Sequence, residues 1–179
     1  MSRKYKFHDN DKLYFISFAV ISWVDLFIRN EYKEIIIRSF LHCVQHKSME
    51  LYAYCIMTSH VHMIIGSRGN LMQNIIRVLK RHTSESLHKE IIQHLTESRK
   101  EWILAMMTEA GTKNSNNVSF QLWQQHSQPV ELNSPKILHQ KLNYIHHNPV
   151  AAGFVDKEED WLYSSARNYY GWQGLIDVI

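Results

Sequence analysis

The chain has 179 residues, of which 45% are hydrophobic, so it is long enough for one well-filled core and short for two. A formal net charge of only +3 excludes the uniformly basic, histone-like class of proteins, and any contact with nucleic acid must therefore be local. No apolar run reaches membrane-spanning length and the basic start lacks a signal-peptide pattern, so we expect a cytoplasmic protein without membrane contact, folded as one domain over 1–179.

The chain begins with a strand pattern followed by a helix pattern. Residues 12–20 are rich in aromatic and β-branched side chains and predict a buried strand. Asn30 is a candidate cap for a helix over 31–46, where apolar residues recur at helical spacing. The two cysteines, Cys43 and Cys55, lie inside apolar patterns without a CxxC motif, which is typical of reduced thiols.

Two further strands are predicted next to each other. Residues 50–57 form the first, and Thr58–Ser59 leaves room only for a tight connection to the second, over 60–66. Asn70 is a candidate cap for the long helix that follows. The order strand, helix, strand, strand, helix matches the opening of a split β-α-β unit, so we expect an α+β fold with a ferredoxin-like antiparallel sheet.

The second half begins with an interruption of this order. Residues 94–119 combine an amphipathic helix pattern with a polar loop, and we interpret them as a helical insertion. Short strands are predicted over 120–123 and 129–132 to complete the sheet.

A strong helix start follows, because Ser134 can cap a helix that has Pro135 at its first position. We expect this helix to finish near Asn148, since Pro149 pushes the residue before it away from helical geometry. An aromatic tail over 156–179 ends the chain.

The strand over 60–66 carries a pair of potential metal ligands. Alternation places His60 and His62 on one face, with Cα atoms about 6 to 7 Å apart, close enough for both imidazoles to bind one divalent ion. The spacing is a weak signal by itself: with 12 histidines in the chain, about one His-x-His triplet is expected by chance. Surface or core histidines are the alternative interpretation.

The helix over 135–148 offers a nucleophile and a further ligand. Tyr144 and Asn148 are four residues apart and therefore share a helix face. A tyrosine hydroxyl can attack a phosphodiester and hold a phosphotyrosine, and the amide oxygen of Asn148 can add a third neutral ligand to an ion at His60 and His62. The pattern alone favours a half-buried aromatic residue and a helix-terminating asparagine.

Three blocks of sequence together resemble a known family. They are His60-Val-His62 before an apolar strand, Tyr144-Ile-His-His-Asn148-Pro-Val-Ala-Ala-Gly-Phe-Val155, and Tyr163-Ser-Ser-Ala-Arg-Asn-Tyr169. The chain resembles the single-tyrosine HUH transposases of insertion sequences, above all the branch called REP-associated tyrosine transposases. The resemblance spans nearly the whole chain, and the second block is far more specific than the first.

The resemblance implies an HUH domain with helices on one face of the sheet and the tyrosine helix near the other. It implies His60, His62 and Asn148 as ligands of Mg²⁺ or Mn²⁺, and Tyr144 as the nucleophile that cleaves and rejoins single-stranded DNA beside hairpins. No nucleotide cofactor is needed, because the 5′-phosphotyrosine keeps the bond energy. One-chain and two-chain arrangements of the tyrosine helix both remain open, so a homodimer is an alternative.

The DNA-binding residues are expected among local clusters of positive charge. Candidates on the helix after Asn70 and at the start of the chain are Arg77, Lys80, Arg81, Lys4 and Lys6. Each of them also fits a solvated helix face or a frayed terminus. The tail aromatics could stack on bases, but the pattern favours packing against a sheet edge or a partner chain.

Two features depart from the family pattern, and two other functions compete with cleavage and joining. Thr58–Ser59 stands where Pro-Asn is expected before the first histidine, and the insertion over 94–119 is unusual.

The first competing function is a domesticated protein that binds hairpin DNA without cutting it. The second is a metal-dependent phosphoesterase that uses water and forms no covalent intermediate.

Overall fold

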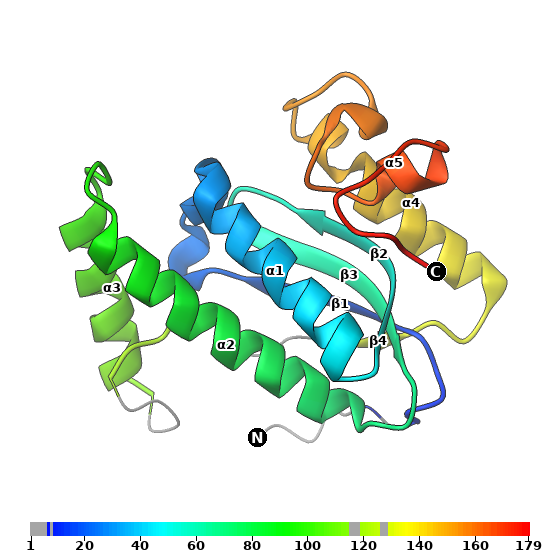
Figure 1. Ribbon diagram of the computed structural model, residues 1–179, viewed down its shortest axis with the longest axis horizontal. Helices are drawn as coiled ribbons and strands as arrows, with labels where there is room; N and C mark the ends of the chain where they lie inside the picture. Colours follow the sequence, from blue (N-terminus) through cyan, green and yellow to red (C-terminus); the bar gives the residue numbers. More distant parts are fainter. Residues whose placement is uncertain (1–6, 8, 115–118, 126–128) are drawn as a thin grey trace.

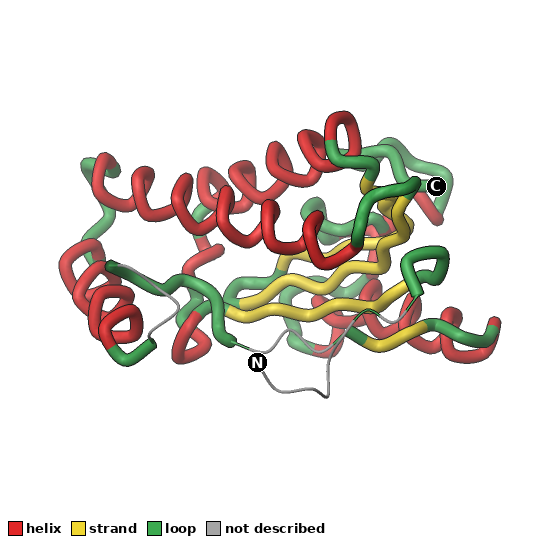
Figure 2. Tube along the Cα trace, turned by 90° about the horizontal axis from the view of Figure 1, so that it is seen from below, coloured by secondary structure: helices red, strands yellow, loops and turns green. Residues whose placement is uncertain are grey.

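The computed structural model describes residues 7, 9–114, 119–125 and 129–179 and arranges them around an antiparallel sheet (Figure 1). The sheet has the order β2-β3-β1-β4 and consists of β1 (Tyr14–Ala19), β2 (Met49–Ile56), β3 (His60–Ser67) and β4 (Val130–Glu131). Helices α1 (Asn30–His46) and α2 (Met72–Gln93) cover one face, and α4 (Pro135–Ala151) lies on the other (Figure 2). The predicted α+β, ferredoxin-like fold is confirmed.

The strands divide their side chains between two cores by simple alternation. Ile16 of β1 pairs with Met63 of β3, and both are fully buried beneath α1 and α2. The neighbouring residue Ile64 points the other way and packs in a smaller cluster with Ile145 of α4. Because successive side chains point to opposite faces, one strand supplies both cores.

The helices α1 and α2 do not begin at the asparagines that the sequence suggests. Arg29 and Leu71 occupy the two N-cap positions, and neither side chain makes a capping hydrogen bond. Asn70 instead donates to the carbonyl oxygen of Lys47 at 3.0 Å, whereas the backbone N–H of Met72 donates to Asn10 Oδ1 at 2.9 Å. Both cap predictions are wrong: Asn30 already belongs to α1 and its side-chain oxygen accepts from Lys33 Nζ at 3.1 Å, and a residue distant in sequence satisfies the start of α2.

Helix α4 runs further than predicted. Its start is as expected, with Ser134 Oγ accepting from the backbone N–H of Ile137 at 3.3 Å, but it continues through Pro149 to Ala151. A proline in the last turn removes one intrahelical hydrogen bond, and Pro149 is buried, so packing outweighs that loss. The consequence is that Asn148 stays helical and in register with Tyr144.

The end of the sheet is shorter than predicted. Residues 120–123 form no strand and are joined to the sheet edge by one isolated bridge between Val20 and Trp123. The Trp123 ring packs on Phe18 with centroids 4.7 Å apart, and its Nε1–H donates to Thr83 Oγ1 at 3.0 Å. This side-chain packing and two backbone hydrogen bonds, from Ile21 N–H to the Leu122 carbonyl and from Gln124 N–H to the Ala19 carbonyl, together hold the segment against the sheet edge.

The segment 94–119 contains α3 (Lys100–Thr112), which stands at the end of the molecule opposite α5 (Ala166–Tyr169) and the C-terminus (Figure 1). Three short 3₁₀ turns complete the elements: η1 (Ile21–Trp23), η2 (Leu26–Ile28) and η3 (Glu158–Asp160). Both cysteines are free and buried, as expected. Among the described residues, no helix is both long enough and apolar enough to cross a bilayer.

The aromatic tail divides into a packed part and an exposed part. Trp161 donates its Nε1–H to the carbonyl oxygen of Ile56 at 3.0 Å, and Tyr163 donates to Glu34 at 3.0 Å, so both close the β2 edge of the sheet. Burial of Lys33, whose ammonium lies 4.6 Å from the Tyr163 ring, lowers the pKa of that lysine. Tyr170 and Trp172 remain exposed.

Candidate functional site

The two histidines of β3 lie side by side on the face that carries α4. Their ring centroids are 4.7 Å apart, and His62 pairs with Ser17 of β1, near the middle of the sheet. His62 is buried, whereas His60, at the end of the strand, is partly exposed. Alternation along β3 thus places both imidazoles on one surface, as predicted.

Helix α4 brings the tyrosine and the asparagine to these imidazoles. The Tyr144 ring lies 5.1 Å from the His62 ring, and Asn148 Nδ2 lies 3.4 Å from His62 Nε2. Asn148 also lies close enough to His60 to raise the pKa of that imidazole against the effect of burial. All four side chains belong to one chain, so the tyrosine helix meets the histidines of its own sheet. Tyr144 is 48% exposed and lines a surface groove, so a substrate can reach this residue.

The surroundings of the imidazoles keep them neutral. Burial, followed by the neighbouring His60 and the Lys141 ammonium, lowers the pKa of His62 to about 3. Burial also lowers the pKa of His60, against smaller opposing effects of Asn148 and Asp25. Neutral imidazole is the form that binds metal ions, so neither ring must lose a proton at neutral pH.

The donor set at this point fits a divalent cation. Among the described residues there is no group of three or more His, Cys, Asp and Glu side chains that could hold a metal, so the third protein ligand would be the amide of Asn148. Amide oxygen and nitrogen are distinguished only by their hydrogen bonds, and a half turn of the amide presents Oδ1 to the imidazoles. Two nitrogens and one oxygen leave coordination positions for phosphate oxygens.

The Thr58–Ser59 turn holds the first histidine in place. Ser59 Oγ lies 3.1 Å from His60 Nδ1, which leaves Nε2 as the nitrogen free to face Asn148. The Thr58 hydroxyl donates to Asp25 Oδ1 at 2.6 Å, and the Thr58 carbonyl accepts from the Phe27 N–H at 2.7 Å. These hydroxyls give the unusual sequence of the turn a structural role.

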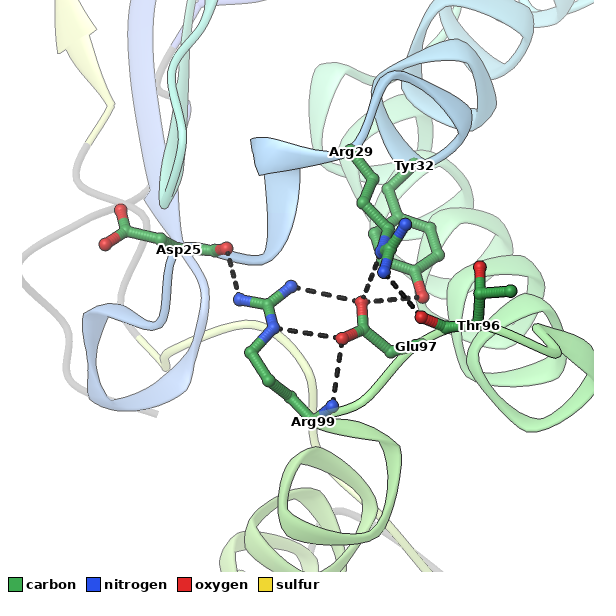
Figure 3. Close-up of polar contacts among 6 residues, drawn as sticks. All are labelled: Asp25, Arg29, Tyr32, Thr96, Glu97 and Arg99. Carbon is green, nitrogen blue, oxygen red and sulfur yellow. Dashed lines mark hydrogen bonds and ion pairs between the residues drawn. The ribbon is translucent and has the colours of Figure 1, made fainter.

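A buried carboxylate secures the segment that contacts this turn (Figure 3). Glu97 accepts from Arg29 Nε at 2.9 Å and from Arg99 Nε at 3.0 Å, and Arg99 Nη1 donates to the Asp25 carbonyl at 3.0 Å. The hydrogen bonds from Arg99, against the opposing effect of burial, hold the pKa of Glu97 at about 2. The α2–α3 connection is thereby fastened to the segment that precedes α1.

Sequence reasoning missed Lys141 as a site residue. Its ammonium lies 4.6 Å from the Phe15 ring centroid and 5.7 Å from that of Tyr144, within reach of both aromatic faces. A shallow groove beside it is lined by Gln140, Lys141, Asn143, Tyr144, His147, Glu158 and Tyr170. The signal was available in the sequence, because Lys141 stands three residues before Tyr144 and shares its helix face.

The structure does not bring the basic residues of α2 to this site. Helix α2 covers the opposite face of the sheet, where Arg77 and Arg81 are exposed and Arg81 lies 3.4 Å from Glu85. Lys80 donates to the carbonyl oxygen of Gln124 at 3.2 Å, and burial lowers its pKa to about 8. Lys4 and Lys6 lie outside the described residues.

Comparisons with known proteins point to one family. The model of the family described as "Transposase IS200 like" matches residues 22–118. A protein of Haemophilus influenzae, provisionally named a REP-associated tyrosine transposase, is 29% identical over 123 residues; the match covers 68% of this chain and 61% of the relative. The family match includes His60 and His62 and ends before Tyr144 and Asn148.

A solved structure shares the fold across the whole chain. It is described as a REP-associated tyrosine transposase bound to a REP hairpin, and it superimposes with a TM-score of 0.67 at 16% sequence identity. The match covers 100% of this chain and 94% of the other, so it includes α4 as well as the sheet. At this identity the likeness concerns the arrangement of the elements.

Proposed function

The chain belongs to the IS200-like transposase family, and from this premise we propose that it cleaves and rejoins single-stranded DNA beside hairpins through a 5′-phosphotyrosine at Tyr144. The observation that carries the proposal is the convergence of Tyr144, His62 and Asn148 from distant parts of one chain. Since the solved relative of the same fold is bound to a REP hairpin, we take a DNA hairpin with a single-stranded flank as the substrate class. Such a reaction would take place in the cytoplasm.

The reaction is a pair of phosphoryl transfers. The hydroxyl oxygen of Tyr144 attacks the scissile phosphorus, its proton passes to solvent, and the 3′ oxygen of the preceding nucleotide leaves as a free hydroxyl. Attack of another 3′ hydroxyl on the phosphotyrosine restores the tyrosine and joins the new strands. The number of phosphoester bonds is unchanged, so no nucleotide cofactor is consumed.

His60, His62 and Asn148 would hold the metal ion. A bound Mg²⁺ or Mn²⁺ supplies Lewis acidity toward the scissile phosphate, and its double charge is not reduced by three neutral ligands. The imidazole donors favour Mn²⁺ in vitro, since Mg²⁺ prefers oxygen ligands. Burial of His62 keeps water from one side of the site, which strengthens electrostatic interactions there.

Lys141 adds a positive charge on the tyrosine side of the site. Its ammonium lies over the Phe15 and Tyr144 rings, so it can hold a phosphate of the strand without sequence preference. His60, His62, Tyr144 and Asn148 of one chain lie together, which supports a reaction that uses the tyrosine of the same chain.

Covalent trapping tests this function. Labelled single-stranded hairpin DNA incubated with the protein and Mn²⁺ should give an adduct that survives denaturation, and Tyr144→Phe should give none. Tyr170→Phe is the matched control, because Tyr170 lines the same groove and is exposed to a similar degree; its adduct should match the parent's.

The other outcomes identify the competing functions. DNA binding without cleavage or adduct would indicate a hairpin-binding protein that does not cut. Cleavage that survives Tyr144→Phe would indicate a phosphoesterase that uses water. Either result overturns the proposed function.

A further inference from the structure

The turn after β1 holds an exposed tryptophan in a strained backbone conformation. Ser22 and Trp23 have φ values of +53° and +55°, a left-handed region that residues with side chains rarely adopt. The turn is nevertheless well anchored, because the Trp23 N–H donates to the Val20 carbonyl at 3.0 Å and the Ile21 N–H donates to the Leu122 carbonyl at 2.8 Å. Strain of this kind persists where the surrounding structure enforces it, and it is concentrated at functional sites.

The strained turn places the indole beside the candidate metal ligands. The Trp23 ring is 58% exposed, while its neighbours Ile21 and Val24 are buried. Its centroid lies 5.5 Å from that of His60, and the two rings meet at 72°. A nearly perpendicular contact covers at most one face of the indole, and the core does not use the other. An exposed aromatic face next to a site for single-stranded DNA suits base stacking.

The ring contacts also define an order along the site. Tyr144 contacts His62, His62 contacts His60, and His60 contacts Trp23. In an in-line displacement the leaving 3′ oxygen lies opposite the attacking tyrosine oxygen. The nucleotide that carries this oxygen therefore extends away from Tyr144, and the row of ring contacts leads away from Tyr144 to Trp23.

From this order we infer that Trp23 stacks on the base immediately 5′ of the scissile phosphate. The inference rests on the proposed function and adds a subsite for an unpaired nucleobase. Stacking on an indole tolerates any base, so Trp23 would fix the position of the cut nucleotide and leave its identity to other contacts.

Trp23→Gly tests the subsite without the usual ambiguity of removing a large side chain. Glycine adopts positive φ freely, so this change removes the ring and relieves the strain at φ +55°. We expect unchanged or higher thermal stability together with a loss of affinity for single-stranded DNA of about 5- to 150-fold, the range for one stacked base. Trp102→Ala on α3 is the control, since Trp102 is 55% exposed, and it should bind as the parent does.

The measurement has two parts, both with Tyr144→Phe protein in chelator, so that cleavage plays no role. Fluorescence anisotropy with a thymidine 12-mer compares the affinities of the variants. The second part uses a hairpin substrate that forms an adduct with the parent, and it replaces single flanking nucleotides by abasic ones. An abasic nucleotide just 5′ of the cut should lower the affinity of the protein that retains Trp23. It should leave the affinity of the Trp23→Gly protein unchanged.

The outcomes separate this inference from the proposed function. Equal affinities of Trp23→Gly and Trp102→Ala proteins, with adduct formation intact in the parent, would overturn the subsite alone. A loss of thermal stability in Trp23→Gly that accounts for the lost binding would assign the ring a structural role. Sensitivity at another abasic position would overturn its placement 5′ of the cut. A parent that binds no single-stranded DNA would overturn both proposals.

Discussion

The two faces of the sheet differ in how they are covered, although the same strands supply both. Toward α1 and α2, residues such as Ile16 and Met63 are fully buried in an apolar layer. Toward α4, the same strands present His60 and His62, and the helix above them keeps Tyr144 half exposed. One face therefore carries most of the apolar burial, whereas the other holds polar groups that a well-packed core would exclude.

Because of this difference, residues that stabilise the fold and residues proposed for catalysis alternate along the same strand. Val61 and Met63 alternate with His60 and His62 along β3, so neighbours in sequence serve different faces. Substitutions of buried residues on the α1–α2 face should lower the free energy of unfolding, and substitutions of the histidines on the α4 face should lower activity. The following predictions test that separation.

The largest effect is expected for His60→Ala. Loss of one ligand from the α4 face should reduce cleavage of single-stranded DNA by about 10²- to 10³-fold, the range for removing one electrostatic contact to a transition state. Affinity for the same DNA in chelator should not change, because phosphate contacts remain. His139→Ala, on the exposed side of α4, is the control and should cleave normally. Normal cleavage by His60→Ala would remove the metal site from the mechanism.

Met63→Ala, on the same strand, should lower stability and leave the activity unchanged. Truncation of this fully buried side chain should lower the free energy of unfolding by about 2 to 5 kcal/mol, measured by urea denaturation. Adduct formation per folded molecule should stay at the parent level, since Met63 faces away from α4. A selective loss of cleavage at unchanged stability would show that the two faces are not independent.

Glu97→Ala should destabilise the protein by about 1.5 to 3 kcal/mol, because it leaves the partly exposed Arg29 and Arg99 without their shared carboxylate. The pKa of Glu97 in the folded state, about 2, lies below its ordinary value of 4.5. Its ion pairs therefore stabilise the protein above pH 4.5, and this contribution is lost as the pH falls toward 2. Thermal unfolding between these limits should depend less on pH in Glu97→Gln than in the parent; equal slopes would contradict the assignment.

The smallest effect is expected for Lys141→Met. Loss of one phosphate contact should weaken binding of single-stranded DNA by about tenfold at low salt and lower the salt slope of the affinity by about 1. Lys136→Met removes an equal charge from an exposed position on the same helix and should have little effect. If both variants lose affinity equally, Lys141 contributes only general charge.

Much of the fold could be predicted because it depends on local patterns. The strand–helix order, the alternation over 60–66 and the helix start at Ser134 all follow from short-range rules. The errors occurred where distant residues decided the outcome. Asn10 satisfies the start of α2 in place of Asn70, and burial of Pro149 carries α4 past its predicted end.

The candidate site was predictable in its parts and not in its surroundings. Spacing placed His60 beside His62 and Tyr144 in line with Asn148, and the resemblance to a family joined the two pairs. Lys141 was overlooked although helix spacing places it beside Tyr144, whereas Trp23 could not be found in this way, because its proximity to His60 arises from packing. The basic residues of α2 were prominent in the sequence, yet their helix covers the face opposite the candidate site. A charge cluster in the sequence does not reveal which face of the sheet its helix covers.

By itself the sequence determined which side chains share a face of each strand and helix, because strand and helix periods are properties of the local backbone. The tertiary structure alone decided that α4 lies on the histidine face of its own sheet, and that a strained turn places an indole at the end of this row. These placements result from the burial of apolar surface contributed by segments far apart in the chain, which local patterns do not encode.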